Sequence, residues 1–166
     1  MDMDKAKLQK DVIILLMAAG VPLELLQIWK MVPLIVAPSE RFTPGWLKQR
    51  KQRALGLFSG VAGIQYIAEE IEAEYGWFAV VVSASHEAIH AIRYMTGRYT
   101  RFSVGTVVEA QEDLIADSIL LRALANCSEQ SWTRKEKGKA KRVIQKRIKL
   151  YLRRFPKMNT RGVTLL

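Results

Sequence analysis

Two histidines and a glutamate stand close together in the stretch His86-Glu87-Ala88-Ile89-His90. This is an H-E-x-x-H pentapeptide, and it contains both histidines of the chain. On a helix, residues four positions apart project from one face, so the two imidazoles can bind a single metal ion. Glu87 points beside that face, where its carboxylate can take a proton from an attacking water. These residue types predict hydrolysis at Zn²⁺, which accepts such ligands and keeps one position open.

The residues around the pentapeptide are apolar and uncharged, from Ala79 to Val82 before it and at Ala91 and Ile92 after it. Such surroundings favour the buried helix that an active site requires. The alternative interpretation is an amphipathic helix whose two histidines are solvated or capped.

A catalytic zinc site needs a third protein ligand, and no further histidine is left to supply it. The longer pattern H-E-x-x-H-x-x-G-x-x-H is not met, because Arg93 and Thr96 stand where its glycine and last histidine would be. We therefore expect a carboxylate from the next predicted helix, with Glu109, Glu112 and Asp113 as candidates.

A donor for the oxyanion of the tetrahedral intermediate is also needed. Tyr94, Tyr99 and Arg101 are the candidates, and nothing in the sequence chooses among them.

Residues 111–117, Gln-Glu-Asp-Leu-Ile-Ala-Asp, resemble the E-x-x-A-[D/N] pattern on the glutamate helix of gluzincin-type metallopeptidases. The resemblance implies that Asp113 is the third zinc ligand and that Asp117 supports a ligand histidine from behind. Aspartate stands where the family has the longer glutamate, so Glu112, with a shift of one residue, is the alternative third ligand.

The apolar run that follows, Ile119-Leu120-Leu121, is similar to the same region of ImmA/IrrE-type metallopeptidases, where Met-Pro stands in place of Arg122-Ala123. These are small intracellular zinc enzymes that cut repressor-like proteins. The resemblance covers residues 80–124. It implies a small zincin-like domain that hydrolyses peptide bonds in a protein substrate, such as a DNA-associated regulator.

The positive charge of the chain is concentrated near its end. Residues 131–166 hold thirteen Lys and Arg and one acid, whereas residues 1–130 hold thirteen bases and fifteen acids. Such an uneven charge distribution indicates the kind of partner that a protein binds. The basic region 131–161 predicts contact with nucleic acid or an acidic partner. Because no DNA-reading motif is present, nucleic-acid contact would be independent of sequence and sensitive to salt.

Hydrophobic periodicity predicts an α+β fold, mostly helical with a short sheet. We expect a zincin-like metallopeptidase domain at 1–130, followed by a basic amphipathic helix and tail at 131–166. Residues 77–82 are either a strand or the first turns of the histidine helix. Residues 45–57 are best explained as a solvated helix face, with a phosphate-binding patch as the alternative. The other predicted elements are helices at 8–20, 23–29, 64–74, 109–125 and 132–155, a strand at 34–36, and a strand or hairpin edge at 99–108.

The chain is expected in the cytoplasm. Its single Cys127 excludes an internal disulfide and is best explained as a buried thiol. Residues 12–36 approach the length of a membrane span, but Glu24 and Lys30 lie within them, and a charge at mid-membrane costs roughly 2.5–3.5 kcal/mol. Two packed helices are therefore the better prediction.

Two functions follow from these observations. The first is a zinc peptidase in which His86, His90 and Asp113 hold Zn²⁺ and Glu87 moves the proton. The alternative is a non-catalytic binding or structural protein whose basic C-terminal region contacts nucleic acid or an acidic partner, or an anionic membrane surface.

Overall fold

The computed structural model describes residues 3–98, 107–128 and 131–157. It is mostly helical with a small three-stranded sheet, which confirms the predicted α+β class. The strands are β1 (Leu34–Ala37), β2 (Gly56–Ser59) and β3 (Ile64–Ala68). The helices are α1 (Lys5–Ala18), α2 (Leu23–Lys30), α3 (Ser39–Phe42), α4 (Gly45–Gln49), α5 (Ile71–Tyr75), α6 (Trp77–Met95), α7 (Val107–Asn126) and α8 (Arg134–Arg154).

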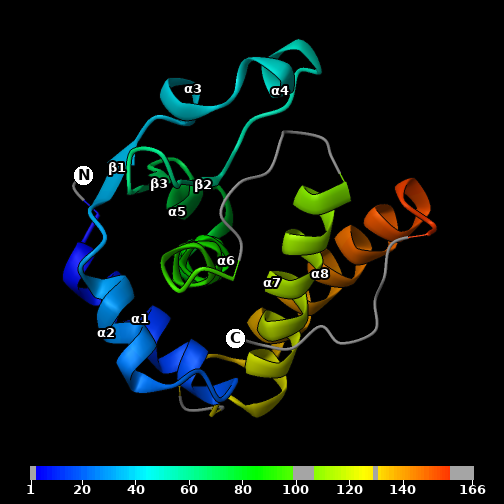
Figure 1. The fold of residues 1–166 in the computed structure, drawn as a ribbon. Coiled ribbons are helices and arrows are strands. Elements are labelled where there is room, and N and C mark those ends of the chain that lie inside the picture. Colours follow the sequence, from blue (N-terminus) through cyan, green and yellow to red (C-terminus); the bar gives the residue numbers. More distant parts are fainter. Residues whose placement is uncertain (1–2, 99–106, 129–130, 158–166) are drawn as a thin grey trace.

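Helix α6 lies at the centre of the fold. Figure 1 views it nearly end-on, with the sheet and α5 on one side, α1 and α2 on a second side, and α7 and α8 on a third. Twelve residues of α6 are buried, among them Val80, Ala84 and Ile89. A helix that is apolar on nearly every face must be enclosed by other elements, and this surrounds the histidines with packed structure.

Helix α6 begins directly after Gly76, at φ +87°, and Gly97, at φ +71°, follows its end. Both glycines adopt left-handed backbone that other residues rarely accept, so the chain turns sharply at each end of the helix. Residues 77–82 therefore form the first turns of the histidine helix, which settles an alternative that periodicity had left open.

The sheet has the order β1-β3-β2, with β1 parallel and β2 antiparallel to the central strand β3. The helix predicted over 64–74 is wrong, because these residues form β3 and then the short helix α5. The apolar spacing of this stretch fits a helix, but pairing with a strand on each side satisfies the backbone of β3 and outweighs that local pattern. Gln65 secures β3 from within: it accepts a hydrogen bond from Trp29 and donates one to the Ala84 carbonyl of α6.

The helix predicted over 45–57 is also wrong in its extent. Helix α4 ends at Gln49, and Lys51 has a positive φ of 55°. The chain then runs into β2, which starts at Gly56. The strand predicted at 34–36 is confirmed as β1, although only Ala37 within it is buried.

Residues 12–36 form α1, α2 and β1, and none of the described helices is long and apolar enough to cross a membrane. Cys127 is buried, as predicted. The hairpin edge predicted at 99–108 lies mostly outside the described residues, and its last two residues, Val107 and Val108, begin α7.

Helix α8 packs along α7 in the antiparallel sense. Lys137, near its start, donates to the Cys127 carbonyl, whereas Phe155, just beyond its end, packs near Ala110. Ile144 is 1% exposed and belongs to the main core. A capping box at Thr133 fixes the start of this helix.

Candidate metal centre

Three side chains from two helices meet at one point. His86 and His90, four residues apart on α6, turn their Nε2 atoms toward each other at 3.0 Å. Asp113 of α7 brings Oδ1 to 3.2 Å from Nε2 of His86 and 3.0 Å from Nε2 of His90. Within the described residues, this is the group of histidine, cysteine and acidic side chains that can hold a metal ion.

The size of this triangle fits a first-row metal. Zinc bonds to nitrogen and oxygen are about 2.0–2.1 Å long, so two ligand atoms of a tetrahedral site lie roughly 3.3 Å apart. The three measured edges, 3.0, 3.0 and 3.2 Å, are close to that value. Two imidazoles and a carboxylate also match the donor preference of zinc. The residues present therefore fit such an ion.

Asp117, fully buried on α7, holds His86 from behind. Its Oδ1 lies 3.0 Å from Nδ1 of His86. In the neutral imidazole that binds a metal, the N–H at Nδ1 donates a hydrogen bond to this carboxylate, which leaves the lone pair of Nε2 directed into the triangle. Asp117 thus fixes both the tautomer and the ring orientation that a metal ligand needs.

Arg147 of α8 binds the same carboxylate. Its Nη2 lies 2.6 Å from Oδ1 of Asp117 and its Nε lies 3.1 Å from Oδ2. Oδ1 is therefore shared between a guanidinium from α8 and an imidazole from α6. A chain of contacts runs from the C-terminal helix through Asp117 to His86.

The charges at the metal-free site stabilise one another. Burial lowers the pKa of His86, but the charge of Asp117 and hydrogen bonds to Asp113 and Asp117 outweigh it and raise that pKa to about 10. Burial raises the pKa of Asp113, yet hydrogen bonds from His86 and His90 bring it below its ordinary value. The pKa of Asp117 is likewise lowered, against its burial, by His86 and Arg147. A metal ion binding here must displace a proton from His86.

Glu87 lies next to the triangle and is held by the sheet. Its Oε2 accepts a hydrogen bond of 2.8 Å from the backbone N–H of Phe58 on β2. This close approach depends on Gly56, because a Cβ at that position would lie 2.8 Å from Cγ of Glu87. The strand therefore positions the carboxylate and leaves Oε1 available as a proton acceptor.

Glu112, the alternative third ligand, is engaged elsewhere. Arg93 of α6 binds both of its oxygens, through Nε at 2.6 Å and Nη2 at 3.0 Å. Both side chains of this pair are less than 10% exposed. Glu109, the remaining candidate, lies in the first turn of α7 and outside the triangle. The structure brings Asp113, and not these two glutamates, to the histidines.

Of the three candidates for the oxyanion donor, Tyr94 is the one that lies within the described residues. Tyr94 packs its ring edge-on against Phe58, with the ring centroids 5.7 Å apart, and its ring would clash with a Cβ at Gly60. Tyr99 and Arg101 lie outside the described residues.

Tyr151 of α8 was not among the predicted site residues. It follows Arg147 by one helical turn, as Asp113 precedes Asp117 by one turn, and the antiparallel packing of α7 and α8 sets the two pairs side by side. Burial and the carboxylates of Asp113 and Asp117 raise the pKa of Tyr151 above its ordinary value, so its hydroxyl keeps its proton.

A signal for Arg147 and Tyr151 exists in the sequence. Ile144, Arg147, Ile148 and Tyr151 follow the spacing i, i+3, i+4 and i+7, which places them on one face of a helix. An arginine within an apolar stripe indicates a buried partner. This arginine does not stand out in the sequence, because twelve other Lys and Arg residues follow residue 130.

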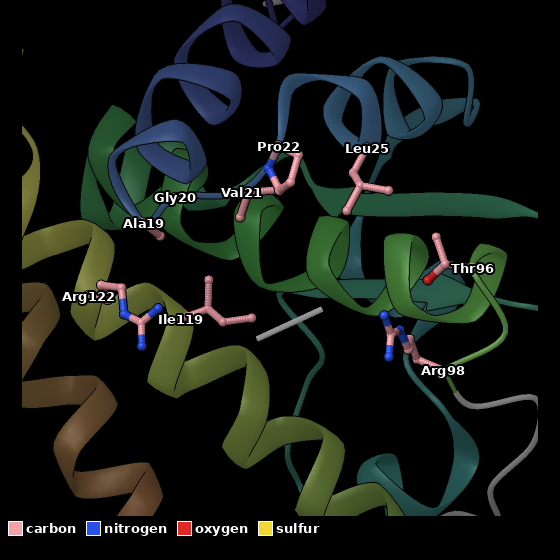
Figure 2. A pocket seen from close by; sticks show the side chains of 9 residues that line it. All are labelled: Ala19, Gly20, Val21, Pro22, Leu25, Thr96, Arg98, Ile119 and Arg122. Atoms are coloured by element: carbon pink, nitrogen blue, oxygen red, sulfur yellow. The ribbon is translucent and has the colours of Figure 1, made fainter. Parts of the chain in front are cut away.

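Cavities lie on different sides of α6 in the described part of the chain. Figure 2 shows one of about 280 Å³, between the α1–α2 turn and the ends of α6 and α7, with Arg98 and Arg122 on its opposite sides. It contains none of the site residues above. The other, of about 340 Å³, lies between α6 and α8 and includes Arg147 in its wall.

No protein-family model matches this sequence, and no curated protein or solved structure is significantly similar to it.

Proposed function

We propose that the protein is a zinc-dependent peptidase that hydrolyses peptide bonds in a protein substrate. The observation that carries this proposal is the triangle of His86, His90 and Asp113 with the carboxylate of Glu87 beside it. Two imidazoles and a carboxylate suit a site with one open position, and an adjacent carboxylate that is not a ligand is what hydrolysis requires. The resemblance of residues 111–117 to gluzincin-type metallopeptidases supports the same activity.

Each residue of the proposed active site has a separate role in peptide hydrolysis. A bound Zn²⁺ would polarise the scissile carbonyl and acidify the attacking water. Glu87 accepts the proton of that water on Oε1 and passes it to the leaving amine. The Phe58 N–H keeps the carboxylate oriented during both transfers. Asp117 holds His86 with Nε2 toward the ion and compensates its charge.

The position of β2 favours a peptide as the substrate. Within the described residues, β2 pairs with β3 along one edge only, and Phe58 on this strand contacts Glu87. An extended substrate chain can pair with the groups on the other edge that Glu87 does not occupy, and so pass the catalytic carboxylate. A protein substrate with an unfolded or extended segment, such as a DNA-associated regulator, meets this requirement.

The exposed face of α8 favours a second role. It carries basic side chains that point away from the core, including Lys135, Lys139, Arg142, Lys146 and Arg153. A surface of this charge attracts nucleic acid or an acidic partner. We propose that residues 131–161 bring the enzyme to its substrate. If the site binds no metal, this contact is the principal function.

Metal content measured by elemental mass spectrometry tests the proposal first. We expect about one zinc per chain in protein purified without chelator, and none in His86→Ala. Glu87→Gln should retain zinc and lose cleavage of casein or a repressor, because the amide cannot accept the proton. Glu24→Gln, an exposed substitution of the same kind on α2, is the matched control and should leave both unchanged.

Two results would contradict the proposal. One is the lack of zinc in the wild type even after reconstitution at neutral pH. The other is cleavage that persists at the wild-type rate in Glu87→Gln. The first result would leave the basic face of α8 as the remaining basis for function.

A further inference from the structure

The cavity between α6 and α8 is lined mainly by apolar side chains. The lining comes from three parts of the chain: the residue before β2, the stretch from the end of α5 through the first half of α6, and α8. Ile144, Phe78 and Val82 form its buried wall, whereas Val143, 51% exposed, lies at its opening. At about 340 Å³, the cavity is at the small end of the range of about 300–1,000 Å³ for ligand pockets. This is room for one large side chain and not for a long segment of peptide.

The cavity lies directly beside the candidate metal centre. Val82 and Ser83 line it, and each stands one helical turn, about 5.4 Å, before a site residue on α6: His86 and Glu87 respectively. Leu55 also lines it, and the next residue along the chain is Gly56, which contacts Glu87.

Arg147 completes the link between cavity and metal centre. It lines the cavity and also binds Asp117, the carboxylate that holds His86. Arg147 therefore connects the wall of the cavity to the residues that support His86.

We propose that this cavity is the specificity pocket of the enzyme and that it binds one large apolar side chain, aromatic or branched aliphatic, of the substrate next to the cleaved bond. The inference rests on the proposed function. Burial of such a side chain among Phe78, Val82 and Ile144 supplies binding free energy in proportion to the apolar area removed from water. Polar and small side chains gain little there, so the pocket selects where the chain is cut.

Two zinc-chelating probes separate the pocket from the metal. Acetohydroxamate tests the metal alone, and 3-phenylpropanohydroxamate adds one aromatic ring that can reach the pocket. Calorimetric titration of the zinc-loaded protein should give an affinity for the phenyl probe at least about tenfold higher. Because binding is measured without turnover, a protein that cuts no test substrate still gives an answer.

Ala140→Phe fills the pocket from α8, where Ala140 is only partly buried. This variant should keep the affinity for acetohydroxamate and lose the gain from the phenyl group. Gln145→Phe adds the same side chain to the exposed face of the same helix and should bind both probes like the wild type. Val143→Trp, at the half-exposed opening, blocks the pocket independently should Ala140→Phe fold poorly.

The outcomes separate the two proposals. Binding of acetohydroxamate without a gain from the phenyl group, or a gain that survives both filling variants, would overturn the pocket and leave the zinc centre intact. If zinc-loaded protein cannot be obtained or acetohydroxamate does not bind, the proposed function fails and the pocket fails with it.

Discussion

Helix α7 carries two buried carboxylates that each bind an arginine, and the two ion pairs have different roles in the structure. Glu112 gives both of its oxygens to Arg93, so that pair is closed and joins α6 to α7. Asp117 shares Oδ1 between Arg147 and His86, so that pair stays connected to the candidate metal centre. In both pairs an arginine binds the two oxygens of an acidic side chain. What differs is whether one of these oxygens also contacts a third group, and this separates an ion pair that serves stability from one that serves a site.

The largest effect on stability is expected at the closed pair. Glu112→Ala leaves the guanidinium of Arg93 buried without its carboxylate, and breaking a buried pair in this way costs about 3–5 kcal/mol. Denaturant unfolding should show this loss, whereas the folded fraction should still bind about one zinc. The double variant Arg93→Met with Glu112→Leu should recover most of the stability, because it removes both charges. Loss of zinc with stability intact would instead make Glu112 the third ligand.

Substitutions in the open pair, Asp117 and Arg147, should reduce the affinity for zinc more than the stability of the fold. Asp117→Asn keeps the shape of the side chain but removes the charge that orients His86. Losing such a supporting group typically weakens metal binding 10–100-fold. Competition against a chromophoric chelator measures the change. An affinity equal to that of the wild type would show that Asp117 contributes only to folding, like Glu112.

The Asp117–Arg147 pair, the open pair, also contacts a group that titrates, His86. In the metal-free protein the pKa of His86 is raised to about 10, so the charged imidazole stabilises the fold below its unfolded pKa of 6.5. That contribution is lost as the pH rises through about 10. Since zinc must displace this proton, its affinity should rise about tenfold per pH unit below that value.

Calorimetry in buffers of different ionisation enthalpy checks this proton linkage. About one proton should be released from His86 per zinc bound near pH 7, and fewer in Asp117→Asn, where the charge that raises the pKa is gone. The same release in both proteins would contradict the assignment of that proton to the open pair.

The smallest of these effects is expected at Arg147, whose side chain is 38% exposed and therefore partly compensated by water. Arg147→Met should weaken zinc binding severalfold and lower the free energy of unfolding by about 1 kcal/mol. Lys146→Met removes a charge from the exposed side of the same helix and is the matched control. Equal effects of the two substitutions would mean that only the net charge of α8 matters.

The sequence predicts the parts of this site that depend on local spacing. His86 and His90 converge because four residues make one turn of α6, and that spacing is visible in the sequence. Asp113 was predicted by resemblance to a family pattern on a helix, and its carboxylate lies at the histidines. The zincin-like fold itself stays a prediction.

The parts that were missed depend on contacts between distant segments. Arg147 reaches Asp117 only because α8 packs antiparallel to α7 in one register, and periodicity within α8 does not specify that register. The strand β3 was mistaken for a helix because its neighbours β1 and β2, and not its own apolar spacing, decide its conformation. The cavity beside the site arises from three separate segments and has no local signature.

The contact between Arg147 and Asp117 has a consequence for the order of events on the ribosome. A nascent chain that has reached Asp117 already contains both histidines, Asp113 and Glu87, but Arg147 is thirty residues further on. At a synthesis rate of about 5–20 residues per second, roughly 2–6 s pass before that arginine is added. Throughout this interval the emerging polypeptide contains every residue of the candidate metal centre, but Asp117 lacks the arginine that binds it. Translation from the N-terminus thus leaves the contacts around His86 incomplete until α8 has left the ribosome.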